Sequence, residues 1–227
     1  VHHSATLILE NINRAAVINP VTLLSLTLLA TPKHTLDEAI CIKQLDVYRN
    51  LLLKQPYDER TQITPLSGKE IIAYGLKLKL IKRMQHVLGD IIAIEDNQAV
   101  LLTYFRNNIL HAFILPSLVA SLVQHKTALS NVIRTLYPFL KAELFMKWST
   151  NEIQQQIEHY TALLVQMGLI FQDHDGNLFS PTPNSEEHQQ LVTLAMPVQQ
   201  SLERYYMTLA LISQRGSGNI STKQVEE

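Results

Sequence analysis

The chain has 227 residues, of which 46% are hydrophobic, and a formal net charge of −1. A chain of this size can bury a large core, and its balanced charge excludes a general nucleic-acid binder that depends on neutralising phosphates. Its single cysteine, Cys41, excludes a disulfide framework and a thiolate zinc site, and no apolar run reaches the roughly 18 residues that a membrane-spanning helix needs.

The first third of the chain predicts three helices joined by short turns. Asn19-Pro20 ends one helical pattern and begins the next, because proline favours the first turn of a helix. Thr35 and Glu38 have the spacing of a capping box. In this motif the first side chain accepts a hydrogen bond from the backbone N–H three residues later, and the carboxylate accepts one from the backbone N–H of the first residue. The predicted helices cover about residues 5–17, 20–30 and 35–54, followed by a surface connector over 56–65. Because the chain begins with Val inside a helical pattern, we expect it to be part of a longer protein.

The period of the apolar residues changes near residue 80. Ser67 and Glu70 repeat the capping-box spacing and predict a short helix to about Leu78. Three short runs rich in apolar or β-branched residues follow, which predicts a small antiparallel β unit. These runs are Leu80–Met84, Asp90–Glu95 and Gln98–Thr103.

The second half repeats the pattern of helices followed by a hairpin. After a polar break at 126–130, the sequence predicts a helix over 131–147 that Pro138 kinks or splits. Ser149 and Glu152 cap a further helix to Gly168, and Asp175-Gly176 forms the turn of a hairpin over 169–180. The last predicted helix covers 185–213, bent at Pro197, before a loose tail.

These elements predict a mainly α fold, a multi-helix domain with two small antiparallel β hairpin units. We expect a first half over residues 1–125, a second half over 126–213 and a loose tail over 214–227. The repeated order of helices and hairpin near 21–102 and 131–180 is the outline of a winged helix. Such a unit binds DNA or packs against proteins, and the uncharged run Gln154–Gln156 favours the packing role. We interpret the basic run Lys77–Arg83 as a solvated face.

The candidate site lies in residues 103–120, where a polar cluster opens the longest apolar stretch. The candidate residues are Arg106, Asn107, Asn108 and His111. If Arg106 begins a helix, the other three share one face of it. Each buried group left without a partner would cost roughly 1–3 kcal/mol, so these side chains must meet other polar groups. They either bond to neighbouring backbone at a structural junction or face an anionic ligand or second domain, and we favour the junction. No catalytic residue, metal site or cofactor motif is identified.

Several stretches resemble one known family over nearly the whole chain and in the same order. The stretches are INRAAVINPVTLLSLTLLA from Ile12, LGDIIAI from Leu88, YFRNNILHAFILPSLVA from Tyr104, LYPFLKAELFMKW from Leu136 and GLI from Gly168. They resemble the region C-terminal to the catalytic domain of bacterial membrane-associated glycerol-3-phosphate acyltransferases. None of these motifs carries catalytic chemistry.

The resemblance implies a parent enzyme at the cytoplasmic face of the inner membrane. That enzyme transfers an acyl group from acyl-CoA or acyl carrier protein to glycerol 3-phosphate, using the His and Asp of an H-x-x-x-x-D motif. None of the nine histidines here has Asp five positions later, so we expect this chain alone to be inactive. It would be an accessory helical domain that docks on the upstream catalytic domain through residues 103–120, with peripheral membrane contact and no nucleic acid. The alternative is an independent winged-helix interaction module.

Overall fold

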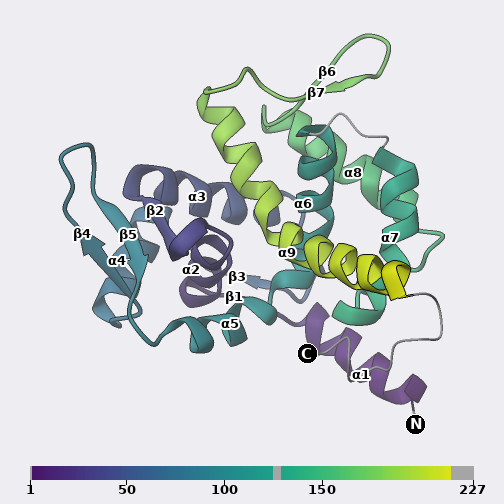
Figure 1. Cartoon of the computed structure of the whole chain (residues 1–227), viewed down its shortest axis with the longest axis horizontal. Coiled ribbons are helices and arrows are strands. Elements are labelled where there is room, and N and C mark those ends of the chain that lie inside the picture. Colours follow the sequence, from purple (N-terminus) through teal and green to yellow (C-terminus); the bar gives the residue numbers. More distant parts are fainter. Residues whose placement is uncertain (1, 125–128, 216–227) are drawn as a thin grey trace.

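The computed structural model describes residues 2–124 and 129–215. The described residues are mainly helical, as predicted, with short strands in small sheets (Figure 1). The helices are α1 (His2–Arg14), α2 (Pro20–Leu29), α3 (Glu38–Lys54), α4 (Gly68–Lys77), α5 (Ala99–Asn107), α6 (Leu110–Gln124), α7 (Leu129–Leu144), α8 (Ile153–Gln166) and α9 (Glu186–Arg215), with a 3-10 turn η1 (Pro32–His34). The strands are β1 (Val17–Ile18), β2 (Thr35–Asp37), β3 (Gln62–Ile63), β4 (Ile81–Met84), β5 (Ile91–Ile94), β6 (Phe171–Gln172) and β7 (Leu178–Phe179).

Two apolar helices form the centre of the core, as the sequence predicts for both. Every residue of α6 from 110 to 120 is buried, because the helix is enclosed by α7, α8 and α9 (Figure 1). Helix α2 is enclosed in the same way by α3, α4 and α5. Its start is fixed by a capping box in which Asn19 and Thr22 bond to each other's backbone.

The three-stranded antiparallel sheet corrects one strand prediction. Its order is β2-β5-β4, so the third strand is β2 and not the predicted run Gln98–Thr103. That run lies in α5, where Leu102 is buried and Val100 and Leu101 point outward. Three apolar residues in a row are compatible with either structure, and packing against α2 favours the helix.

The start of α3 also differs from the prediction. Thr35 lies in β2, and the residue that caps α3 is Asp37, whose carboxylate accepts a hydrogen bond from the Ile40 N–H at 3.1 Å. Glu38 is bound by Arg83 of β4 at 2.6 Å and does not complete a capping box. The strand pairing of Thr35 therefore moves the helix start by two residues. The capping box of Ser67 and Glu70 at α4 is confirmed.

In the second half, the predicted helices and the hairpin are present with shifted ends. Helix α7 continues through Pro138 without splitting and ends at Leu144, because Phe145 has a positive φ of 49°. Ser149 donates two hydrogen bonds to the Glu152 carboxylate, although α8 begins only at Ile153. The hairpin β6–β7 turns at Gly176, whose φ of 85° suits glycine.

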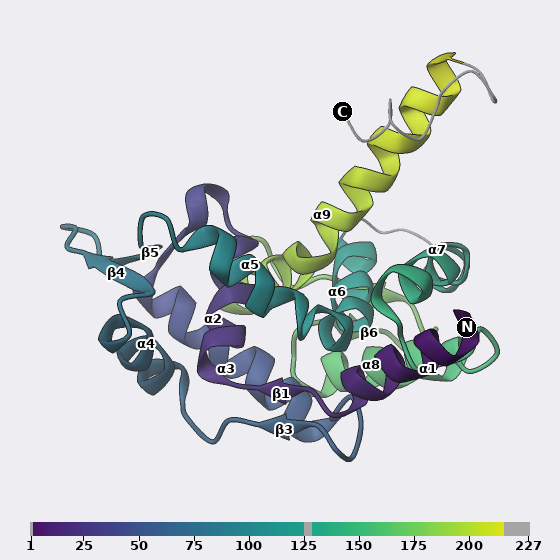
Figure 2. The same ribbon diagram turned by 90° about the horizontal axis from the view of Figure 1, so that it is seen from below.

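Helix α9 changes direction along its length, and its distal half projects from the body (Figures 1 and 2). Pro197 lies inside this helix and has no N–H for the Thr193 carbonyl four residues earlier. The Tyr48 hydroxyl of α3 donates a hydrogen bond to that carbonyl at 3.1 Å. A side chain from the first half of the chain therefore donates the hydrogen bond that the Thr193 carbonyl does not receive from Pro197. Of the predicted tail, residues 214 and 215 belong to α9, and the rest lies outside the described residues.

The predicted division near residue 125 falls on residues outside the described ranges, so it stays a prediction. Helix α9 of the second half packs against α3 and α6 of the first half. In the described part of the chain, no single helix has the length and apolar character needed to cross a membrane. Among the residues searched, which are the described ones, the bent pair of α5 and α6 passes that test by length and composition when its two helices are taken together.

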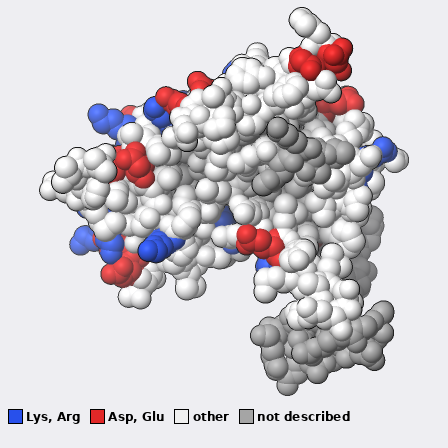
Figure 3. All heavy atoms as spheres, turned by 45° about the horizontal axis from the view of Figure 1, so that its top comes forward, with Lys and Arg blue, Asp and Glu red and all other residues white. Residues whose placement is uncertain are grey.

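Charged side chains of both signs are interspersed on the face seen in Figure 3. At the end of the molecule that carries β4 and β5, Lys82 lies 2.9 Å from Asp96. Arg83 pairs with Glu38 at 2.6 Å. These ion pairs neutralise part of the basic run, which agrees with its interpretation as a solvated face.

Candidate functional site

The predicted polar cluster lies at a corner between two helices. Helices α5 and α6 meet at 84°, so Arg106 and Asn107 end one helix and His111 lies in the first turn of the next. Asn108 is the C-terminal cap of α5 and is exposed. The prediction that Asn107, Asn108 and His111 share a face of one continuous helix is therefore wrong. Helix α5 exposes one side to solvent, whereas α6 is buried on all sides over residues 110–120.

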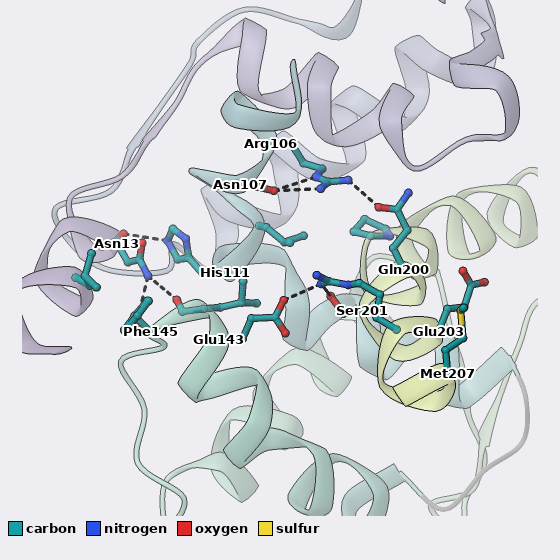
Figure 4. Close-up of a pocket in the computed structure, with 15 residues that line it drawn as sticks. Asn13, Arg106, Asn107, His111, Glu143, Phe145, Gln200, Ser201, Glu203 and Met207 are labelled. Carbon is teal, nitrogen blue, oxygen red and sulfur yellow. Dashed lines mark hydrogen bonds and ion pairs between the residues drawn. The ribbon is translucent and has the colours of Figure 1, made fainter. Parts of the chain in front are cut away.

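Arg106 is partly buried and bonds only to neutral groups among the described residues. Its Nη1 donates to Gln200 Oε1 of α9 at 2.7 Å, and its Nη2 donates to Asn107 Oδ1 at 3.1 Å (Figure 4). Desolvation lowers the pKa of Arg106, and the positive charge of Arg204 lowers it further. The guanidinium stays protonated at neutral pH. Within the described ranges it is therefore a cation without a carboxylate partner.

His111 is a buried neutral residue with a backbone partner. Its Nε2 lies 3.0 Å from the Asn13 carbonyl oxygen, and its ring meets the Tyr57 ring edge-on with centroids 4.7 Å apart. Because a carbonyl oxygen only accepts, Nε2 carries the proton. Burial lowers the pKa of His111 to about 4, and the bond to Asn13 opposes this shift. At neutral pH the imidazole therefore supplies no positive charge.

Asn13 joins three helices at one wall of the site. It lies near the end of α1, where its Nδ2 donates to the Leu144 carbonyl at 2.7 Å and to the Phe145 carbonyl at 3.1 Å. Its own carbonyl accepts the bond from His111 of α6. The left-handed turn at Phe145 brings the end of α7 within reach of this side chain. One asparagine therefore ties together α1, α6 and α7, as Figure 4 shows.

The opposite wall comes from α7 and α9. Arg204 Nη2 donates to Glu143 Oε1 at 2.7 Å and to Ser201 Oγ at 3.2 Å. The other oxygen of Glu143 accepts a hydrogen bond from the Tyr205 hydroxyl. The Glu143 charge is thus compensated within this wall, whereas the Nε and Nη1 groups of Arg204 have no hydrogen-bond acceptor among the described residues.

A cavity of about 590 Å³ lies between these walls. It brings together Arg106, Asn107 and His111 of the predicted cluster, while Asn108 does not line it. The sequence did not point to the remaining polar lining residues, which have no motif or common spacing. They are Asn13, Glu143, Gln200, Ser201, Glu203 and Arg204. The apolar lining consists of Leu9, Leu110, Leu144, Phe145, Pro197 and Met207.

The chemistry of this cavity is that of binding. Among the described residues, no group of three or more His, Cys, Asp or Glu side chains is placed to hold a metal ion. Among the described residues His111 bonds to backbone and not to a nucleophile, and the lining cations Arg106 and Arg204 have donors left unused. The arrangement favours an anionic group over a reacting centre.

Comparison with known proteins places the chain in one family. The model of the glycerol-3-phosphate acyltransferase C-terminal region matches residues 1–227. A glycerol-3-phosphate acyltransferase of Pseudomonas aeruginosa (strain UCBPP-PA14) is 38% identical over 222 residues, covering 96% of this chain and 26% of the relative. One from Xylella fastidiosa (strain M23) is 37% identical over 234 residues, covering 100% of this chain and 27% of the relative.

The chain thus spans about a quarter of the length of these relatives. The match extends over all the stretches from which the family resemblance was inferred, and it confirms that inference. The chain belongs to the family of the glycerol-3-phosphate acyltransferase C-terminal region.

Proposed function

We propose that this chain is an accessory helical domain that supports the catalytic part of a glycerol-3-phosphate acyltransferase. The observation that carries the proposal is the full-length match to the C-terminal region of that family, in a sequence without an H-x-x-x-x-D motif. In the proposed parent reaction, acyl-CoA or acyl carrier protein donates an acyl group to glycerol 3-phosphate. The product, 1-acyl-glycerol 3-phosphate, enters phospholipid synthesis, and this chain supplies no catalytic residue to the reaction.

The surface through which this chain docks on the catalytic part is the outward face of α5. Because α6 is buried in this chain's own core, the contact involves the start of residues 103–120 and the preceding residues of α5. On α5, the side chains of Val100, Leu101 and Tyr104 are 85%, 45% and 65% exposed. Their spacing places them on one side of the helix. Exposed apolar groups on one face support a contact with another protein surface.

The proposal places the parent protein at the cytoplasmic face of the inner membrane, with peripheral contact between this domain and lipid. The loop between β4 and β5 carries the exposed apolar side chains Val87 and Leu88. Exposed apolar side chains at the tip of a loop support contact with a lipid or protein surface.

The test of the accessory role uses the separately produced catalytic part of a family member. Alone, the chain of residues 1–227 is expected to show no acyl transfer to glycerol 3-phosphate. Added to the catalytic part, it should bind and raise the rate of acyl transfer. The double variant Val100→Asp and Tyr104→Asp places charge on the α5 face and should weaken this binding at least tenfold.

Val87→Asp is the control, because it places an aspartate at an apolar residue that is 99% exposed on a different surface. It should bind the catalytic part as the unchanged chain does. Acyl transfer by the chain alone would refute the accessory role, and equal binding by the double variant and the control would refute the α5 surface.

A second candidate, an independent winged-helix interaction module, is supported by the order of the first elements. Helix α2, strand β2, helices α3 and α4, and then strands β4 and β5 follow one another, with β2 next to β5 in the sheet. The basic residues of α4 are Lys69, which is next to Glu70, and Lys77 at the end of the helix, so this helix has few cations for DNA. Retarded migration of duplex DNA at physiological salt would favour this second candidate over the accessory role.

A further inference from the structure

The cavity between α1, α5, α7 and α9 combines two features that a structural junction alone does not require. One is the pair of guanidinium groups, of which Arg106 has no carboxylate partner among the described residues. The other is a set of apolar side chains from α1, α6, α7 and α9 and from the loop after α7, including Leu9, Leu110 and Met207. A guanidinium in a partly buried site gains stability from an anion that it can bind through two parallel hydrogen bonds.

We propose that this cavity binds a small anionic amphiphile, whose phosphate or carboxylate group is held by Arg106 and Arg204 and whose apolar part lies against the neighbouring leucine and methionine side chains. The proposal rests on the proposed function in one respect. Transfer of an acyl group to glycerol 3-phosphate yields a phosphate monoester that carries an apolar chain, so a phosphate monoester is the preferred form of the ligand.

The hydrogen bonds of the two arginines leave donors for such a ligand. Arg106 has five N–H groups, and its bonds to Gln200 and Asn107 occupy one N–H each on Nε, Nη1 and Nη2. Arg204 uses its Nη2 for Glu143 and Ser201 and keeps its Nε and Nη1. These unused donors belong to two residues that line the same cavity.

The two carboxylates that line the cavity do not cancel this attraction. Glu143 accepts hydrogen bonds from both Arg204 and Tyr205, so its charge is already compensated. In Figure 4 the carboxylate of Glu203 points away from Arg106 and Glu143. His111 contributes no charge at neutral pH, because burial lowers its pKa to about 4. Arg106 is therefore the cation with the least compensation in the site.

The volume of the cavity, about 590 Å³, exceeds what a bare phosphate or carboxylate fills. Part of the surplus space is bounded by apolar side chains, among them Leu144 and Phe145. Water in contact with these groups is released when an apolar chain replaces it, which favours an amphiphile over an inorganic anion.

The test measures binding of four small probes to the chain of residues 1–227 by isothermal titration calorimetry below their aggregation concentrations. Hexyl phosphate tests the phosphate monoester, hexanoate the carboxylate, inorganic phosphate the anion without a chain, and hexanol the chain without an anion. Hexyl phosphate should bind at least about tenfold more tightly than inorganic phosphate or hexanol. Tighter binding of hexanoate than of hexyl phosphate would assign the site to a fatty acid and overturn the preference for a phosphate monoester.

Arg106→Gln should weaken hexyl phosphate binding about 10- to 100-fold, as expected for loss of hydrogen bonds to a charged group. Arg106→Lys keeps the charge but loses the paired donors, so its affinity should lie between the two. The matched control is Arg134→Gln, which removes an exposed arginine of α7 that does not line the cavity. Equal losses of affinity in Arg106→Gln and Arg134→Gln would show that binding depends only on the net charge of the chain, and would overturn the proposal.

A measurement on the unchanged chain keeps the test independent of variant folding. Hexyl phosphate should shift the NMR signals of the His111 ring, which lines the cavity, and leave those of exposed His159 unchanged. Equal affinity for hexyl phosphate and hexanol, or no shift at His111 on saturation, would overturn the proposal. Because no catalytic part is present, these outcomes are separate from failure of the docking test.

Discussion

His111 and Asn13 are joined by a hydrogen bond of 3.0 Å between the imidazole Nε2 and the Asn13 carbonyl oxygen. The bond links α1 to the buried helix α6 over a separation of 98 residues. The same imidazole packs against Tyr57, whose hydroxyl accepts the Lys147 N–H at 2.8 Å. One buried side chain therefore connects three distant segments.

Replacing His111 by Ala should lower the free energy of unfolding by about 2–4 kcal/mol. The change leaves the Asn13 carbonyl without its partner and opens a space beside Tyr57, and both effects destabilise the folded state. Urea denaturation measures the loss. His159→Ala is the control, because this exposed histidine of α8 should change stability by about 0.5 kcal/mol or less. Equal effects of the two changes would contradict the role assigned to His111.

The stability of the chain should fall in mildly acid solution because of His111. Its pKa is about 4 in the folded chain and 6.5 ordinarily, so the unfolded chain binds more protons between these values. Stabilisation is therefore complete above about pH 6.5 and decreases as pH falls toward 4, by at most about 1.4 kcal/mol per pH unit. The measurement is urea denaturation of the unchanged chain and of His111→Gln at pH 7 and 4.5. The unchanged chain should lose more stability, and parallel losses would contradict the assignment.

Gly68→Ala should destabilise the chain by about 1–3 kcal/mol, although alanine normally favours a helix over glycine. A Cβ at Gly68 would lie 2.2 Å from the Ile42 carbonyl oxygen of α3, which is backbone and has little freedom to move. Helix α4 would have to shift away from α3. Thermal denaturation measures the loss, with exposed Lys69→Ala as the neighbouring control. A Gly68→Ala variant as stable as this control would show that α4 does not approach α3 so closely.

Cys41 should resist thiol reagents while the chain is folded. The residue is fully buried, and burial, with smaller effects of the Glu38 and Asp37 charges, raises its pKa to about 12. Because the thiolate is the reactive form, labelling by a disulfide reagent at pH 8 should be far slower than that of a free thiol. The rate should rise steeply with urea. As the chain has one cysteine, the signal reports on α3 alone, and rapid labelling without urea would contradict its burial.

Local signals in the sequence predicted those elements whose ends are fixed locally. Asn19-Pro20 and the pair of Ser67 and Glu70 begin their helices as predicted, because their caps use residues within three positions. The ends set by distant contacts differ. Thr35 pairs with Ala93 in the sheet, and this pairing removes it from the helix that it was expected to cap.

The candidate site shows the same limit. Arg106, Asn107 and His111 were identified because polar residues beside a long apolar run are conspicuous. Arg204 was not identified, because the sequence around a single arginine among the polar residues of a long helix does not indicate which residues it will contact. Its place in the cavity depends on packing of α9 against α6 and on the direction of α9 beyond Pro197.

The contact between Tyr48 and the Thr193 carbonyl makes two distant positions depend on each other. While position 197 is proline, the Tyr48 hydroxyl supplies the hydrogen that the helix lacks, so Tyr48→Phe should cost about 1–2 kcal/mol. In a chain with Pro197→Ala, the restored N–H can bond to Thr193, and the same tyrosine change should cost much less. A double-mutant cycle measures this coupling. In related sequences, phenylalanine at position 48 is accordingly expected to accompany a residue other than proline at position 197.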